Sequence, residues 1–205
     1  MANAITGSAV IILMASLLGV PWGIGAGIYL AEYRDGKTNK ILKFMTDLLT
    51  SVPSIIVGLF AYALVVAPLH HYSSYAGAVA LAIIMVPIVA RTTEEILKLM
   101  PNHIREAGLA LGLPKWRVIM SVVLPGSLGG VVTGVMLALA RIAGETAPLL
   151  FTAFSNNFGF RGLNSPISSL PVQIFNYASS HDDHLRAQAW TGALVLVSVV
   201  LILNL

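Results

Sequence analysis

Cysteine is absent from the 205 residues of the chain. This absence excludes disulfide cross-links, thiolate zinc sites and cysteine nucleophiles. Charged residues are also scarce, because they make up 10% of the chain, against about 25% in a typical soluble domain. Hydrophobic residues make up 57%, and the mean hydropathy is +0.83. So few polar side chains cannot cover a soluble globule, and the composition therefore indicates a membrane protein.

Five apolar stretches are long enough to cross a bilayer, whose hydrocarbon core takes roughly 20 residues of helix. They lie at about 5–31, 50–69, 75–97, 122–153 and 186–205. The alternating segments of ~10 residues that build a membrane β-barrel are not visible. We therefore predict an all-α membrane protein, a polytopic bundle of transmembrane helices with five spans that form a single domain over residues 1–205.

The basic residues predict which connections face the cytoplasm. Nine of the twelve lie between spans one and two or around spans three and four: Arg34, Lys37, Lys40, Lys43, Arg91, Lys98, Arg105, Lys115 and Arg117. The connection at 154–185 holds only Arg161, with Arg186 at its far edge, and the connection at 70–74 holds none. The twelfth basic residue, Arg141, lies within the fourth apolar stretch. By the positive-inside rule, 32–49 and 98–121 are cytoplasmic, whereas 70–74 and 154–185 face outward. The net charge of +3 is thus a topology signal and requires no nucleic-acid partner.

The two ends of the chain lack the charges that usually flank a membrane protein. The predicted topology puts the amino terminus outside, and its first eight residues carry no basic side chain, unlike a signal peptide. The last span ends at Leu205 without a basic anchor. We therefore expect the chain to be truncated at both ends and to lack at least one upstream span.

The connection between spans three and four predicts two short helices. Pro101 can open the first helix, and Gly112, with the Leu-Pro pair that follows it, stops that helix. A second amphipathic helix is predicted from Lys115 to about Met120, and it leads to Pro125, where span four starts. Such a unit can seat in the groove of a partner protein or rest as a connector in the lipid headgroups. Amphipathicity alone leaves both interpretations open.

Two charged residues, Arg141 and Glu145, lie within the fourth apolar stretch. They are four residues apart and hence predicted to share one helix face, and Arg141 is ~24 Å along a helix from Pro125. Charges at such depth are costly, so they line a transport pathway or pair with each other. Arginine matches a tetrahedral oxyanion. A neighbouring carboxylate could accept a hydrogen bond from protonated phosphate, but it would repel sulfate.

Glycines recur every four residues on two predicted spans, at Gly19, Gly23 and Gly27 and at Gly126, Gly130 and Gly134. Such ladders let helix backbones approach closely. They suit packing within the bundle and packing between subunits equally well.

The outer connection predicts an interfacial helix over 171–177 with aromatic anchors. The acidic and histidine residues at 181–184, like the histidine pair at 70–71, are adjacent polar side chains that we expect to be solvated, so no metal site is predicted. The chain has no phosphate-cradling glycine loop of an ATPase and no nucleophile–base spacing, so neither ATP hydrolysis nor another enzymatic activity is expected of it.

The cytoplasmic connection resembles the EAA signature of ABC importer permeases, which reads E-A-A, three residues, G, nine residues and I-x-L-P. The matching positions are Glu106, Ala107, Gly108, Gly112, Val122, Leu124 and Pro125. Gly108 stands in place of the second alanine, and Val122 in place of isoleucine. The resemblance implies a type I ABC importer permease fold, in which this segment is a coupling helix that seats in a groove of the ATPase subunit.

Three further stretches, ARIAGETAPLLFTAF at 140–154, SLPVQIFNYASS at 169–180 and IGAGIYLAEY at 24–33, resemble the PstA-type permease subunits of bacterial phosphate ABC importers. This resemblance implies inorganic phosphate as the substrate and a multi-pass location in a bacterial or archaeal plasma membrane. It also implies three partners: a PstC-type second permease, a PstB-type ATPase dimer and an external PstS-type phosphate-binding protein. Arg141 and Glu145 occupy the positions of that family's intramembrane charges. No cofactor is expected on this chain, because ATP would bind the ATPase subunits.

Two other functions remain as alternatives at this point. A molybdate- or sulfate-type permease shares the EAA segment, but not the stretches at 140–154 and 169–180. A non-transporting sensor or scaffold that recruits an ATPase would keep the docking segment, yet it would not depend on Arg141.

Overall fold

A computed structural model describes residues 1–33, 36–156 and 162–204 of the chain. The described residues form helices and loops, without a strand. The helices are α1 (Ala2–Glu32), α2 (Lys37–Ser51), α3 (Ser54–Ala61), α4 (Ala67–Leu69), α5 (Ser74–Leu99), α6 (Asn102–Ala110), α7 (Lys115–Val118), α8 (Leu124–Gly126), α9 (Leu128–Ala143), α10 (Ala147–Thr152), α11 (Leu170–Ala178) and α12 (Asp183–Asn204). Two π-helical turns, Tyr62–Val66 and Ile119–Val123, join α3 to α4 and α7 to α8. Arg34, Arg161 and Leu205, which carry parts of the topology prediction, lie outside the described residues.

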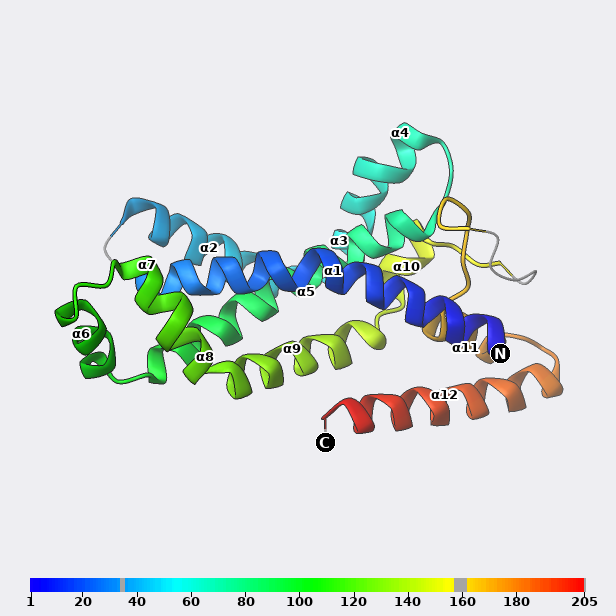
Figure 1. The fold of residues 1–205 in the computed structure, drawn as a ribbon. Helices are drawn as coiled ribbons and strands as arrows, with labels where there is room; N and C mark the ends of the chain where they lie inside the picture. The colour runs from blue at the N-terminus through cyan, green and yellow to red at the C-terminus, as the bar shows by residue number, and fades with distance from the viewer. Residues whose placement is uncertain (34–35, 157–161, 205) are drawn as a thin grey trace.

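Three helices, α1, α5 and α12, are each long and apolar enough to cross a membrane. Two further candidate spans are bent pairs: α2 meets the α3–α4 segment at 106°, and the α7–α8 segment meets α9 at 72°. The described part of the chain therefore holds three to five spans. The all-α, polytopic architecture predicted from the sequence is confirmed (Figure 1).

The second and fourth apolar stretches are divided differently from the prediction. Most of the connection predicted at 32–49 is the helix α2, which ends at Ser51 because Pro53 forces Val52 into an extended conformation. The stretch predicted as one span at 122–153 is broken at Ser127 and again at 144–146. Apolar composition marked these stretches as membrane-embedded, but it does not reveal where a helix bends.

Both glycine ladders pack inside the chain, against the central helix α5. A Cβ atom built on Gly19, Gly23 or Gly27 would lie within 3.2 Å of Met85, Val89 and Thr93, respectively. The glycines of the second ladder pack in the same way on different side chains of α5 and on its C-cap residue. Gly126 lies against the C-cap Met100, Gly130 against Ile96 and Gly134 against Thr92. The ladders thus allow α1 and the α8–α9 segment to approach α5 closely.

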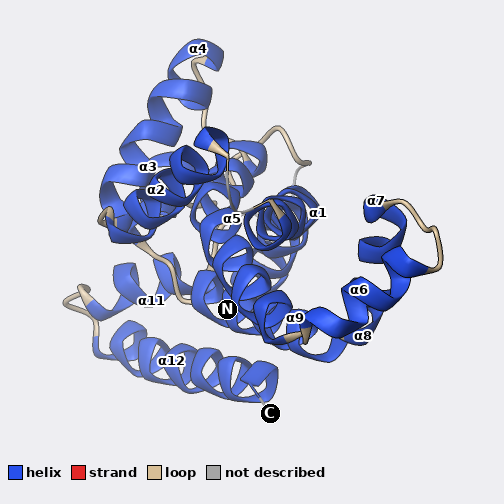
Figure 2. Cartoon of the chain, turned by 90° about the vertical axis from the view of Figure 1, so that its left-hand side faces the viewer, coloured by secondary structure: helices blue, strands red, loops and turns tan. Residues whose placement is uncertain are grey.

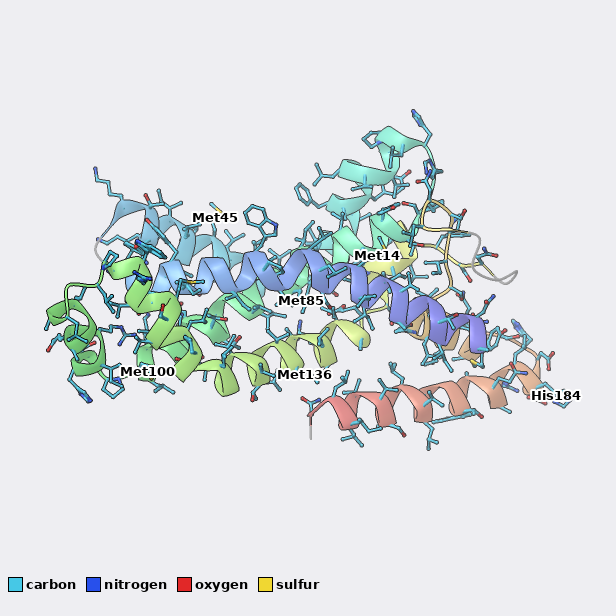
Figure 3. The ribbon with its side chains drawn as sticks, viewed as in Figure 1. Met14, Met45, Met85, Met100, Met136 and His184 are labelled. Carbon is cyan, nitrogen blue, oxygen red and sulfur yellow. The ribbon has the colours of Figure 1, made fainter. Side chains whose placement is uncertain are left out.

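The long axis of the bundle separates two ends. The α6 and α7 helices lie at one end, whereas α4, α11 and the amino terminus lie at the other (Figure 1). The labelled side chains of Met100 and His184 mark these opposite ends in Figure 3. The helix predicted over 171–177 is confirmed as α11. Helix α12 packs against α11 and α9 at the edge of the molecule (Figure 2).

Candidate functional site

Arg141 lines a cavity of about 290 Å³ in the bundle, where the two bent spans meet α5. It belongs to the last turn of α9, and its side chain is 60% exposed. The other lining residues come from the α2–α3 bend and from α5: Leu49, Thr50, Val52, Ser54, Val57, Ile84 and Ile88. Arg141 is therefore the one charged side chain among the described residues that line this cavity.

Glu145 does not share a helix face with Arg141, contrary to the prediction. Helix α9 ends at Ala143 with Gly144 as its C-cap, and Glu145 follows in the break before α10. Its side chain is 14% exposed, and its Oε1 lies 3.9 Å from Arg141 Nη2. This distance permits charge attraction but exceeds that of a hydrogen bond. Arg141 therefore keeps its guanidinium donors available for a third group.

Helix ends of both polarities surround the cavity, because α2 and α9 end there and α3 begins there. Helix α3 begins at Ser54 beside the cavity, and the first N–H groups of a helix carry a partial positive charge. Gly58 of α3 packs so tightly on α10 that a Cβ atom there would lie 2.6 Å from Pro148 Cα. This contact holds the α2–α3 bend against the α9–α10 break. Broken helices that meet in this way form the substrate sites of many transporters.

The predicted helix–stop–helix is present at the other candidate site. Helix α6 ends before Gly112, which has a φ of +78° and so takes the left-handed conformation that glycine favours. Gly108 packs inward on Val118, and a Cβ atom there would lie 2.9 Å from both methyl carbons of that valine. This packing explains why glycine replaces the second alanine of the motif. Of the predicted coupling residues, Gly108 is buried between α6 and α7.

Several other residues of this segment are exposed and form what we call the docking surface: Glu106, Ala107, Leu109, Leu111 and Trp116. Gly112 is exposed beside it. Leu124 and Pro125 lie farther along the chain in α8, where Leu124 is half-buried and Pro125 exposed. The apolar members of the docking surface lack a partner within the described chain, which is typical of a contact site for another protein.

Sequence reasoning missed the contacts that attach α6 to the bundle. A cavity of about 310 Å³ lies between this segment and α1, and it is lined by Glu32, Arg105 and Lys115 as well as by Glu106 and Leu109 of the docking surface. Glu32 and Arg105 form an ion pair at 2.8 Å. These two residues are 73 positions apart, so their proximity depends on how α1 and α6 pack and has no local sequence signal.

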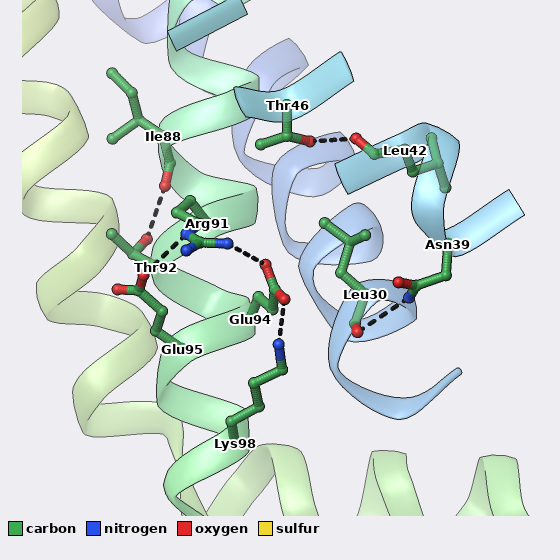
Figure 4. A network of polar contacts seen from close by, with 10 residues as sticks. All are labelled: Leu30, Asn39, Leu42, Thr46, Ile88, Arg91, Thr92, Glu94, Glu95 and Lys98. Carbon is green, nitrogen blue, oxygen red and sulfur yellow. Dashed lines mark hydrogen bonds and ion pairs between the residues drawn. The ribbon is translucent and has the colours of Figure 1, made fainter. Parts of the chain in front are cut away.

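A second charged network lies on α5 (Figure 4). Glu94 is buried, and it pairs with Arg91 at 3.2 Å and with Lys98. Glu95 pairs with Arg91 at 2.9 Å. All these pairs have the i, i+3 or i, i+4 spacing of one helix, so both carboxylates pair with basic residues of α5 itself. In the described parts of the chain, no three His, Asp or Glu side chains gather as metal ligands would.

The known proteins that resemble this chain are membrane components of transport systems. A family model described as binding-protein-dependent transport system inner membrane component matches residues 23–205. The phosphate transport system permease protein PstA of Yersinia pestis is 52% identical over 206 residues, which cover 100% of this chain and 70% of that protein. The PstA protein of Pasteurella multocida is 48% identical over 204 residues, which cover 99% of this chain and 73% of that protein. PstA 1 of Mycobacterium tuberculosis (strain ATCC 25618 / H37Rv) is 37% identical, with coverages of 99% and 67%.

Among solved structures, an inward facing conformation of the MetNI methionine ABC transporter is similar in fold. The TM-score is 0.80 and the sequence identity 20%, and the alignment covers 100% of this chain and 92% of that chain. At this identity the likeness concerns the fold, which is that of an ABC importer permease.

Proposed function

We propose a route for inorganic phosphate through this chain, which belongs to the PstA family of phosphate transport system permease proteins. In this function the chain is the permease subunit of an ATP-driven importer. It is a multi-pass inner-membrane transport subunit and not an enzyme, since ATP is hydrolysed by a separate subunit of such importers. Neither the molybdate- or sulfate-type alternative nor the sensor alternative is favoured, because the relatives are named for phosphate transport.

The translocation pathway is proposed to pass the cavity that holds Arg141. This cavity lies between two bent spans, and its one charged lining residue is a cation with unused donors. A guanidinium binds a tetrahedral oxyanion through two parallel hydrogen bonds. The amino-terminal end of α3 adds a partial positive charge, whereas the carboxyl ends of α2 and α9 add partial negative charge, so the guanidinium supplies the attraction for an anion. Arg141 in this cavity is the structural observation that carries the proposal.

Glu145 is proposed to select phosphate against sulfate. Its carboxylate is sheltered and lies 3.9 Å from the guanidinium, so an anion bound to Arg141 would come close to it. Phosphate at neutral pH carries a proton that it can donate to this carboxylate. Sulfate has no proton to donate, and two negative oxygens would then face each other without a hydrogen bond.

The docking surface is proposed to lie in the cytoplasm and to seat in a groove of the ATPase. It is at the opposite end of the bundle from α4 and α11, as expected if the two ends face opposite sides of the membrane (Figure 1). The full set of partners is proposed to be a PstC-type second permease, a PstB-type ATPase dimer and a PstS-type binding protein outside. No cofactor is proposed for this chain.

Replacement of Arg141 tests the pathway. In proteoliposomes that hold the complete transporter, Arg141→Ala is expected to lower ATP-driven uptake of labelled phosphate by about 10- to 100-fold, because a hydrogen bond to a charged group is lost. Arg141→Lys keeps the charge but not the two-pronged geometry and should retain only part of the uptake. Arg186→Ala is the matched control, since Arg186 is 54% exposed beside a carboxylate at the outer end of the bundle. Undiminished uptake by Arg141→Ala would contradict the pathway.

Replacement of Glu145 tests the selectivity. Glu145→Gln removes the negative charge, keeps a side chain of the same size with one hydrogen-bond acceptor, and adds an NH2 donor. We expect sulfate to become a competitor of phosphate uptake in this variant, whereas arsenate, which also carries a proton, competes in both proteins. If sulfate stays excluded from Glu145→Gln, the carboxylate does not select the anion.

A further inference from the structure

Arg105, the residue before the exposed Glu106, is turned into the protein and not toward the docking surface. Its side chain is 14% exposed. Its guanidinium donates to Glu32 Oε1 from Nε at 2.8 Å, to the carbonyl of Met100 from Nη1 at 2.6 Å and to the carbonyl of Leu97 from Nη2 at 2.7 Å. One side chain of α6 therefore binds the ends of both α1 and α5.

Glu32 is buried more deeply than its partner, with 4% of its side chain exposed. A carboxylate so sheltered depends on its cation, because removing one member of a buried pair leaves an uncompensated charge. The backbone carbonyl of Glu32 also accepts a hydrogen bond from Lys115 Nζ of α7 at 2.6 Å. The same ammonium lies 4.3 Å from the centre of the Tyr33 ring, which adds a cation–π contact.

Arg105 binds two carbonyl groups at the carboxyl end of α5, and the Leu97 carbonyl also accepts a hydrogen bond from the Met100 N–H. Leu97 and Met100 close α5, so the positive guanidinium also meets the negative end of the α5 dipole. Beside these polar contacts, the apolar side chains of Leu97, Ala31, Val118 and Val123 are buried in one cluster. Helices α1, α5 and α7 are thus held together by both apolar and charged contacts.

We infer that Arg105 is a positioning residue that, with Glu32, transmits the displacement of the docking surface to α1 and α5. We call Arg105, Glu32 and the carbonyls of Leu97 and Met100 the clasp. Because the clasp joins α6 to two long helices, α6 moves with them as one rigid unit when the ATPase closes around ATP. Helix α5 also carries Ile84 and Ile88 of the Arg141 cavity, so this unit reaches the proposed pathway directly.

The clasp and the docking surface have different roles, although Arg105 and Glu106 are neighbours in the sequence. Glu106 is exposed and available to a partner, whereas Arg105 and Glu32 are sheltered and satisfied within the chain. The inference rests on the proposed function, because a transmission device has a purpose only in an ATP-driven permease. It predicts that the clasp can be weakened without loss of ATPase binding.

The first test measures coupling in the complete reconstituted transporter. Glu32→Gln keeps the size of the side chain and one acceptor for Arg105 but removes the charge. We expect phosphate transported per ATP hydrolysed to fall by about tenfold, while co-purification of the ATPase and its hydrolysis rate stay near the wild-type values. Arg105→Gln should behave in the same way. Glu95→Gln, the same change at an exposed carboxylate of α5, should leave the ratio unchanged.

Glu106→Gln provides the contrasting variant, since it should weaken co-purification of the ATPase. An unchanged transport ratio in both clasp variants would overturn the inference. It would also be overturned if Glu32→Gln lost the ATPase in the manner of Glu106→Gln, since the clasp would then act through docking and not through transmission.

A second measurement leaves the clasp intact and so does not depend on how its variants fold. The chain contains no cysteine, so spin labels can be placed on introduced cysteines at His103 of α6 and Gly25 of α1. Both positions are exposed, and nothing lies within 4 Å of a Cβ atom at Gly25. The distance between the labels is expected to stay the same with and without ATP, and a shift on ATP binding would overturn the rigid unit. If the wild-type complex transported no phosphate while this distance stayed fixed, the proposed function would fail separately from the rigid unit.

Discussion

Two arginines of this chain have the same side chain but different surroundings, and the surroundings decide what each can bind. Arg141 and Arg105 are both intrachain ion-pair partners, yet the first is 60% exposed with a carboxylate at 3.9 Å. The second makes contacts of 2.6–2.8 Å with groups of two other helices. A loosely paired, accessible arginine can bind a passing anion, whereas a fully bonded one holds helices in place. The same side chain is therefore proposed to serve transport at one position and coupling at the other.

His71, in the turn between α4 and α5, is expected to titrate above the ordinary histidine value. Its Nε2 lies 2.9 Å from Asn164 Oδ1 and its Nδ1 lies 2.8 Å from the carbonyl of Leu69. Both partners are acceptors, so the hydrogen bond with Asn164 first, and that with Leu69 second, raise the pKa of His71. Because the folded-state pKa is raised, the stabilising contribution is complete below about 6.5 and is lost as the pH rises through the raised value.

A histidine-labelled NMR titration of the transporter checks this expectation. Asn164→Ala should bring the pKa of His71 back toward its ordinary value, since the larger cause of the shift is removed. If His71 titrated at the same pH in both proteins, the contact between the turn and residue 164 would not exist in solution.

At the level of elements, close approach and helix breaks determine the architecture. Helix α1 crosses the molecule beside α5 because its glycines leave room for the side chains of α5. Helices α2 and α9 end within the bundle, the first before Pro53 and the second before Gly144. These interruptions leave helix ends, with their partial charges, beside the cavity of Arg141.

Gly27→Ala is expected to destabilise the α1–α5 seam by about 1–3 kcal/mol, as overpacking does. A Cβ atom at Gly27 would lie 2.5 Å from Thr93 Cβ and 2.6 Å from the carbonyl oxygen of Ala90, so a backbone must shift. Gly25→Ala on the same helix is the matched control, because its Cβ would meet nothing within 4 Å. Thermal unfolding of the purified complex should show a lower midpoint for Gly27→Ala alone. Equal midpoints for the two variants would mean that α1 and α5 do not approach so closely.

At the scale of the whole molecule, one chain leaves costly surface uncovered. The side chain of Arg141 is 60% exposed, and a charge left uncovered near the bilayer centre costs at least about 2.5–3.5 kcal/mol. Large apolar side chains of α12, among them Trp190 and Leu194, are exposed too, but on a candidate span they suit contact with lipid. The exposed arginine is therefore the feature that calls for a covering subunit.

We therefore expect the isolated chain to be unstable in detergent and to elute as a single species only when it is produced together with its partner permease. Size-exclusion chromatography with a thermal melt of each preparation measures this difference. A stable, monodisperse monomer would contradict the expectation. Arg141→Ala should be measured alongside, because removal of the exposed charge should reduce the difference in melting temperature between the isolated chain and the chain in its complex.

The sequence alone determined the membrane class, the helical fold, the apolar stretches, the stop at Gly112 and the family, because each depends on composition, local backbone preference or a motif of adjacent residues. Only the tertiary structure decided that Glu145 follows the end of α9 and that α2 bends into α3. It also brought Glu32 to Arg105 and showed that both glycine ladders pack on α5. These features depend on helices that pack across tens of residues, and a burial pattern read along one helix does not specify the partner that provides the burial.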